Sequence, residues 1–130
     1  MIQSHSLDLL IRIKNAYQAR RKTLTTPASN FSVAVAEIVK KNGFIKDYSV
    51  KNIDSKKEMT LDLIYTNNTP VLTDVKIYSK PGRRMYCNSG NIPWGNEPTS
   101  LIIISTSKGL LNQKQAQKAG LGGELIAQLW

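Results

Sequence analysis

The strongest constraint on the fold is an apolar run, Leu101–Ile104, that the hydroxyl-rich run Ser105–Gly109 follows directly. Four consecutive apolar residues, with no polar residue alternating between them, predict a strand that is buried on both faces. Such a strand is fixed by packing on each side. We therefore expect the polar residues after it to be held rigidly at one end of a sheet.

The hydroxyl-rich run has two chemical interpretations. The hydroxyls of Ser105, Thr106 and Ser107 both donate and accept hydrogen bonds, so they can bind ribose 2′-OH groups and base edges in the shallow minor groove of RNA. The same residues, followed by Lys108 and Gly109, are also ordinary turn material, in which hydroxyls bond the local backbone and glycine takes a positive φ. The residues alone leave both interpretations open.

The charge balance is that of a protein that binds polyanions. The chain has 18 Lys and Arg against 9 Asp and Glu, a net charge of +9 and a pI near 9.8. Nucleic acid and anionic lipid both fit this balance. The cations form two islands, which predict contact at two points: residues 1–30 hold Arg12, Lys14, Arg20, Arg21 and Lys22 against Asp8, and residues 76–96 hold Lys76, Lys80, Arg83 and Arg84 against no acid.

Length and composition exclude several classes of protein. A chain of 130 residues forms one ordinary domain or two very small ones. No apolar run approaches the roughly eighteen residues of a membrane span. The single Cys87 cannot form an internal disulfide and is expected to fill space. The N-terminal sequence MIQSHSLDLL lacks the features of a secretory signal or a transit peptide, so we expect the protein to act where it is made.

Catalytic chemistry has little support in the sequence. The chain has one histidine, His5, one cysteine, and carboxylates with no evident dyad or metal-ligand cluster. The glycine spacings of phosphate-binding loops are absent. We predict no enzyme activity, no metal and no cofactor; the alternative is an RNA-modifying or nucleotide-dependent enzyme whose site is assembled in space. A second alternative, docking on anionic membranes, lacks the helix with apolar and Lys-rich opposite faces that it requires.

Residues 1–68 are predicted to form an N-terminal module with the order α-β-α-β-β. Apolar residues at helical spacing predict a helix over about residues 5–20. Ser29 or Asn30 caps a second helix, which Gly43 ends. The strands are expected at residues 22–26, ended by Pro27, and at 44–50 and 59–65, the last two joined by the polar connection 52–57.

Residues 69–130 are predicted to form a mostly antiparallel β module with a short helix, which makes the chain an α+β protein of two small modules. The turn-rich segment 66–70 marks the boundary. Pro81-Gly82 predicts a tight turn that presents the two arginines after it. Asn112 opens a capping-box pattern, and the helix that follows ends at Gly120. The strands are expected at residues 71–78, 101–104 and 124–129.

Several separated motifs occur in an order that is typical of one family. They are DLLIRIKN at residues 8–15, GFIKDY at 43–48, SKPGRRMY at 79–86, STSKGLL at 105–111 and AGLGGEL at 119–125. With these motifs in register over nearly the whole chain, the sequence resembles the bacterial form of the eighth protein of the small ribosomal subunit. Trp94 departs from the family pattern, and we expect it to pack or to make a lineage-specific contact.

The resemblance implies a structural constituent of the small ribosomal subunit that binds the central domain of 16S-type rRNA directly, supports its assembly and acts in translation. The implied partners are a helix of that RNA, neighbouring small-subunit proteins and the protein's own messenger RNA, with no membrane and no small-molecule substrate. The implied location is the ribosome of the bacterial cytoplasm or, alternatively, of an organelle.

The resemblance also implies an RNA-binding site. Ser105, Thr106, Ser107 and Glu124 would read the minor-groove side of an irregular helix, and Tyr86 would stack on a base or ribose. From the residues alone, Glu124 can instead form a strand-edge salt bridge, Tyr86 can pack, and the glycines can end a helix or admit a neighbouring strand. The other implied contacts are Lys80, Arg83, Arg84, Lys108, Gly109, Gly122 and Gly123 in the C-terminal module and Arg12, Lys14, Asn15 and Ser29 in the N-terminal module.

Overall fold

The computed structural model describes the backbone of residues 4–130 and the side chains of residues 8–130, and the chain divides into two compact units. The first unit ends at Thr73 and the second is Asp74–Trp130. Both combine helix with antiparallel strands, which confirms the predicted α+β class. The turn-rich segment at residues 66–70 folds into a small hairpin of β4 (Tyr65–Thr66) and β5 (Thr69–Pro70). The module boundary expected at residue 68 stays a prediction.

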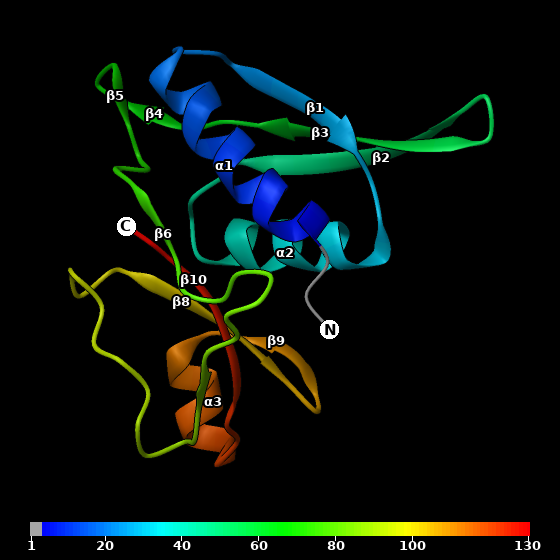
Figure 1. Ribbon diagram of the computed structural model, residues 1–130. Helices are drawn as coiled ribbons and strands as arrows, with labels where there is room; N and C mark the ends of the chain where they lie inside the picture. The colour runs from blue at the N-terminus through cyan, green and yellow to red at the C-terminus, as the bar shows by residue number, and fades with distance from the viewer. Residues whose placement is uncertain (1–3) are drawn as a thin grey trace. The chain divides into compact units, whose positions relative to one another are not determined.

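The first unit has the predicted order of elements (Figure 1). They are α1 (Ser4–Gln18), β1 (Thr23–Pro27), α2 (Asn30–Lys41), β2 (Asp47–Ile53) and β3 (Lys56–Asp62). The strands form an antiparallel sheet in the order β1-β3-β2, so β3 is central. α1 packs on α2 and β1, and α2 packs on β2. The buried apolar side chains include Leu9, Leu10, Ile13, Val35, Val39, Met59 and Leu61.

One buried hydroxyl joins three parts of the first unit. Tyr17, on α1, donates to the carbonyl of Phe44 at 2.6 Å and accepts from the backbone N–H of Ile64 at 3.1 Å. Phe44 lies between α2 and β2, and Ile64 follows β3. Burial raises the pKa of Tyr17, so its hydroxyl stays protonated and able to donate at neutral pH. The helix is thereby fixed to the sheet through backbone groups that would otherwise be unsatisfied.

The ends of α2 form as predicted. Ser29 is its N-cap, and its side chain accepts from the N–H of Ser32 while the side chain of Ser32 accepts from the N–H of Ser29. Asn42 is the C-cap and Gly43 follows with a φ of +82°. The side-chain bonds at the N-terminus satisfy backbone N–H groups that the helix leaves without a partner.

Polar contacts also connect α2 to the start of β2. The hydroxyl of Tyr48 donates to Glu37 at 2.6 Å, which lowers the pKa of Glu37 and raises the pKa of Tyr48. The ammonium of Lys40 lies 3.1 Å from the carboxylate of Asp47 and lowers its pKa. Both carboxylates are therefore ionised at neutral pH.

The predicted connection between the second and third strands is wrong. The prediction is a polar connection over the six residues 52–57, but β2 and β3 pair through Ile53 and Lys56, and the turn is only Asp54 and Ser55. Both turn residues have a positive φ, 48° and 65°, as a two-residue hairpin turn requires. Aspartate is common in this turn, but serine occupies the second position, where glycine is usual, so the polar run concealed the turn. The two strands are accordingly displaced by about three residues from their predicted positions.

The second unit is a sheet covered by one short helix (Figure 1). Its central strand, β10 (Gly123–Leu129), pairs with β8 (Leu101–Thr106) along one edge and with β6 (Val75–Ile77) and β7 (Tyr86–Cys87) along the other. β9 (Gly109–Leu111) pairs with β8. All pairs are antiparallel, as predicted, although the first strand covers only part of the expected residues 71–78.

The apolar run at residues 101–104 is buried on both faces, as predicted. Ile102 and Ile104 belong to a core cluster with Ala116 of α3 (Gln113–Ala119) and Leu125 of β10. The side-chain amide of Gln113 ties α3 to this strand, since it accepts from the N–H of Ile102 at 2.9 Å and donates to the carbonyl of Ser100 at 2.6 Å.

Both ends of α3 also match the prediction. Asn112 is the N-cap and exchanges side-chain hydrogen bonds with Gln115, while Gly120 is the C-cap in the left-handed region with a φ of 67°.

Candidate nucleic-acid interface

The hydroxyl-rich run is the tip of the β8–β9 hairpin. Ser105 and Thr106 belong to β8, Ser107 and Lys108 form the turn, and Gly109 begins β9 opposite Thr106. Gly109 has a φ of +100°, which an L side chain rarely adopts. The loop is therefore shorter than predicted, because three of its five residues, Ser105, Thr106 and Gly109, are paired in strands.

The three hydroxyls have different roles in this hairpin. Thr106 donates to the carbonyl of Gly109 at 2.8 Å and accepts from the N–H of Lys108 at 3.2 Å, so its hydroxyl closes the turn. Ser105 is half-buried and Ser107 is exposed. No hydrogen bond among the described residues occupies either serine hydroxyl. Turn chemistry thus explains the threonine and leaves both serines available to a ligand.

A row of three polar side chains crosses the sheet next to this tip. Glu124 of β10 lies directly opposite Ser105 of β8 and directly opposite Tyr86 of β7. Residues opposite one another in antiparallel strands point to the same face. Tyr86 is 70% exposed, so its ring does not pack in the core. One face of the sheet therefore carries a hydroxyl, a carboxylate and an aromatic ring side by side.

The carboxylate in this row has a cation next to it. Arg84 Nη1 lies 3.6 Å from Glu124 Oε2, and the side chains are only 24% and 12% exposed. This is the salt bridge that the sequence allowed as the alternative role of Glu124. It balances both charges in a partly dry environment, and so it holds the two side chains in place beside Tyr86.

Two glycines allow β10 to approach its neighbours. A Cβ on Gly123 would lie 2.0 Å from the carbonyl oxygen of Ser105, and one on Gly122 would lie 2.4 Å from that of Cys87. No side chain fits at either position. Close approach of packed strands therefore explains both glycines, whereas Gly120 ends a helix. Cys87 is half-buried beside the core cluster, and burial raises the pKa of its thiol, consistent with a space-filling role.

A second tight turn presents cations. Lys80 and Arg83 exchange backbone hydrogen bonds of 3.0 and 2.9 Å around Pro81-Gly82, and Gly82 has a φ of +81°. The buried hydroxyl of Ser79 accepts from the N–H of Met85 at 2.9 Å and so fixes the base of the turn. The predicted turn is confirmed, and the side chains of both cations are exposed.

The first unit has a basic hollow of about 360 Å³ on its surface. Arg12 and Asn15 of α1, which the sequence singled out, line it together with Arg21 and Thr25. Site prediction missed the last two, although Arg21 belongs to the N-terminal basic island. Only the chain reversal between α1 and β1 brings them next to the helix. Ala16 of α1, Ala19 just after the helix and Leu24 of β1 complete the lining.

Some of the predicted contacts of the first unit already interact with other groups of the chain. Arg12 forms an ion pair of 3.0 Å with Asp8, one helical turn away. Lys14 is half-buried. Ser29 caps α2, as described above, so helix capping accounts for its hydroxyl. The structure thus brings Arg12 and Asn15 together but gives Ser29 a separate, local function.

Metal-ligand clusters and membrane-spanning helices are absent from the described residues. In the part of the chain that the structure describes, no group of three or more His, Cys, Asp or Glu side chains is placed to hold a metal. No helix among the described residues is both long and apolar enough to cross a bilayer. The side chain of His5 lies outside the described residues.

Comparison with known proteins gives a consistent result. A family model described as ribosomal protein S8 matches residues 6–130. The chain is 42% identical over 123 residues to the small ribosomal subunit protein uS8 of Mycoplasmopsis pulmonis, covering 95% of this chain and 93% of the relative. It is 37% identical to uS8 of Pelagibacter ubique, with 95% and 94% covered. It is 36% identical to uS8 of Acinetobacter baylyi, with 97% and 96% covered.

Replacing Gly123 with alanine tests the packing of β10. We expect Gly123→Ala to reduce the free energy of unfolding by about 3 kcal/mol or more, because the methyl group would meet a backbone carbonyl that cannot move aside. Urea unfolding measures the loss. The control is Gly90→Ala, whose methyl would meet only the Asn88 side chain at 3.8 Å and should change stability by less than about 1 kcal/mol. Equal stability of the two variants would contradict the packing argument.

Proposed function

Because this chain belongs to the ribosomal protein S8 family, we propose that it is a structural, non-catalytic component of the small ribosomal subunit that binds the central domain of 16S-type rRNA and supports its assembly in translation. The observation that carries the proposal is the row Ser105–Glu124–Tyr86 beside the exposed hydroxyl of Ser107. A small polar group, a carboxylate and an exposed ring on one face suit the shallow minor groove of an RNA helix.

In this proposal, the second unit distinguishes the cognate RNA from other RNA sequences. Ser105 and Ser107 bond ribose and base edges, Glu124 accepts from an exocyclic amine, and Tyr86 stacks on a base or sugar. Arg84 acts with Glu124 as one charge-balanced pair. Thr106, Gly109, Gly122 and Gly123 shape the surface. Lys80, Arg83 and Lys108 lie exposed around it and bind phosphate oxygens.

In this proposal, the first unit makes additional contacts with the RNA backbone. The hollow that Arg12, Asn15, Arg21 and Thr25 line combines guanidinium, amide and hydroxyl groups, which are common contacts of phosphate and sugar. Lys14 and Ser29 are the remaining candidates from the same module. The first unit has eleven Lys and Arg against six Asp and Glu, so its overall field also attracts RNA.

Partners and location follow from the same proposal. Neighbouring small-subunit proteins would adjoin the chain in the ribosome, and its own messenger RNA is a further proposed ligand. The bacterial relatives favour the cytoplasmic ribosome, with the ribosome of an organelle as the alternative.

The direct test compares two RNA ligands across a range of salt. The purified protein is titrated with a small-subunit central-domain fragment and with an unrelated duplex of equal length, from about 50 to 200 mM salt. We expect a preference for the cognate fragment of about a thousandfold that persists at the high end. If both RNAs bind equally and high salt abolishes the binding, the protein is only a nonspecific polyanion binder and the proposed function is wrong.

Removing one hydroxyl tests the proposed reading surface. We expect Ser107→Ala to weaken cognate binding by about 5- to 150-fold, because RNA groups lose a hydrogen-bond partner that water does not fully replace. Thr106 is left unchanged, since its hydroxyl closes the turn. Ser49→Ala, on an exposed position of β2, is the matched control and should bind normally. Unchanged affinity of the Ser107 variant would assign this serine to turn chemistry alone.

Removing one exposed arginine tests the phosphate contacts. We expect Arg83→Ala to weaken cognate and unrelated RNA alike and to lower the slope of log K against log salt by about one. Lys41→Ala is the control, because it also removes one positive charge. The ammonium of Lys41 already lies 3.7 Å from the carboxylate of Glu37, so its loss should change the salt slope less than the loss of Arg83 does. A loss confined to the cognate fragment would instead identify Arg83 as a reader of sequence or shape.

A further inference from the structure

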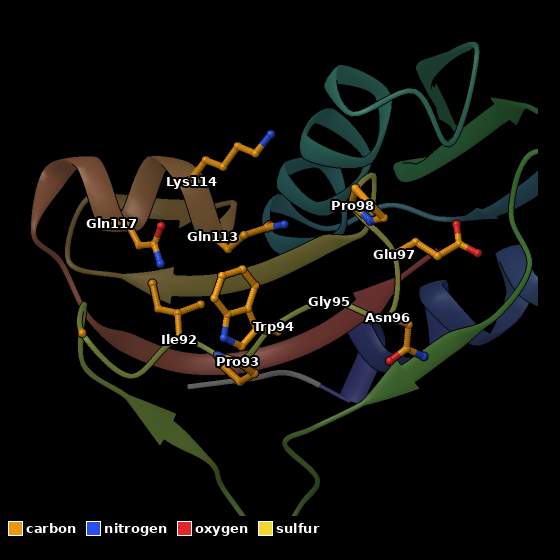
Figure 2. Close-up of a pocket in the computed structure, with 11 residues that line it drawn as sticks. Ile92, Pro93, Trp94, Gly95, Asn96, Glu97, Pro98, Gln113, Lys114 and Gln117 are labelled. Carbon is orange, nitrogen blue, oxygen red and sulfur yellow. The ribbon is translucent and has the colours of Figure 1, made fainter.

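Trp94 is the most exposed large apolar side chain among the described residues, with 96% of its surface accessible. It lies beside a hollow of about 570 Å³, the size of many ligand pockets (Figure 2). The sequence offered packing or a lineage-specific contact as its role, and the exposure excludes packing. An indole in water contributes nothing to the core of this chain, so its position requires another explanation.

The loop that carries the indole is firmly fixed. The N–H of Asn96 donates to the side chain of Gln128 at 2.6 Å, and the N–H of Glu97 donates to the hydroxyl of Ser100 at 2.9 Å. A Cβ on Gly95 would lie 2.5 Å from the Cβ of Ser100, so the chain folds back tightly next to the indole. The ring is therefore attached to an ordered support and not to a free strand end.

Helix α3 contributes polar groups to the same hollow (Figure 2). Lys114 and Gln117 line it and are exposed. In Figure 2 the amide of Gln117 points toward the hollow, and the side chain of Lys114 extends outward from the helix, away from the indole. The amide of Gln113 is occupied by β8 and Ser100, as described above. No hydrogen bond among the described residues occupies the amide of Gln117. An aromatic ring and an available amide thus face one hollow, and an ammonium extends outward from its rim.

The charges of the second unit favour an anionic occupant. It has seven Lys and Arg against three Asp and Glu, and residues 76–96, which lead into the loop, have four cations and no acid. Of the three acids, Glu124 is paired with Arg84. Glu97 also lines the hollow, but it lies well apart from Lys114, with Trp94 and Gln113 on the side of the lysine (Figure 2).

We propose that this hollow binds an unpaired RNA nucleotide, whose base stacks on the indole of Trp94 while Gln117 bonds its edge and Lys114 its phosphate. A nucleotide uses all three groups at once, because it joins a flat π-face, polar base edges and an anion. The proposal rests on the proposed function, since it adds a second contact to an RNA-binding protein. It concerns residues separate from the Ser105–Glu124–Tyr86 row.

Tryptophan fluorescence gives a direct readout of stacking. The Trp130→Phe variant leaves Trp94 as the only tryptophan of the chain. Three RNA probes are titrated: a short single-stranded oligoribonucleotide, a central-domain fragment with its unpaired nucleotides, and the same fragment made fully paired. We expect the first two to quench the emission of Trp94 and the fully paired fragment to leave it unchanged, because only an unpaired base can stack on the ring.

Single substitutions then show which side chains contribute to the binding affinity. We expect Trp94→Ala to weaken binding of the fragment with unpaired nucleotides by about 5- to 150-fold and to leave the fully paired fragment unaffected. Trp94→Phe should retain most of the affinity, because a smaller ring still stacks. Gln117→Ala and Lys114→Ala should each show a smaller loss with the same probe. Since Trp94 is exposed, these differences cannot arise from unfolding, which circular dichroism checks.

The outcomes separate this inference from the proposed function. If both cognate fragments bind normally but no probe quenches Trp94 and Trp94→Ala has no effect, the nucleotide site is wrong and the proposed function stands. If quenching occurs only on addition of another small-subunit protein, the hollow binds protein and the inference is also wrong. If neither fragment binds selectively but the single strand still quenches, the stacking site stands and the proposed function fails.

Discussion

The second unit depends on a contact between backbones that only glycine permits. β10 lies so close to β7 and β8 at Gly122 and Gly123 that an added Cβ would come within 2.4 and 2.0 Å of carbonyl oxygens. This approach begins the central strand, and the strand then aligns Ser105, Glu124 and Tyr86 in one row. The geometry of the candidate interface therefore depends on the lack of a side chain at Gly122 and Gly123. The polar residues of the row occupy positions that this close approach of the strands creates.

Within that frame, the polar groups divide into those that hold the fold and those that remain for a ligand. Thr106 closes the hairpin, Ser29 caps a helix, and Arg84 balances Glu124, so these groups have partners in the chain. Ser107, like the Arg83 side chain, is exposed. A hydrogen bond to RNA costs less when it does not first break one in the protein. The most informative residues for binding are thus the ones whose side chains the fold does not use.

Features that depend on nearby residues could be predicted from the sequence, whereas contacts between residues far apart in the chain could not. The caps of α2 and α3, the turn at Pro81-Gly82 and the buried strand at residues 101–104 depend on neighbours within a few residues, so they followed from pattern. The tight turn at Asp54-Ser55 was missed because serine, with a positive φ, stands where glycine is usual. The row across β7, β10 and β8 and the hollow beside Trp94 join residues far apart in the chain, and no spacing rule specifies such pairings.

The distribution of charge separates affinity from selectivity. Both units carry an excess of cations, eleven against six and seven against three, so both attract phosphate at long range without regard to sequence. Attraction of this kind weakens as salt rises and cannot distinguish one helix from another. Discrimination requires groups of fixed position that contact base edges or ribose, and in the described residues such groups gather where β10 fixes its neighbours. Under the proposed function, selectivity would therefore depend on the packing of the second unit, and affinity on the surfaces of both units.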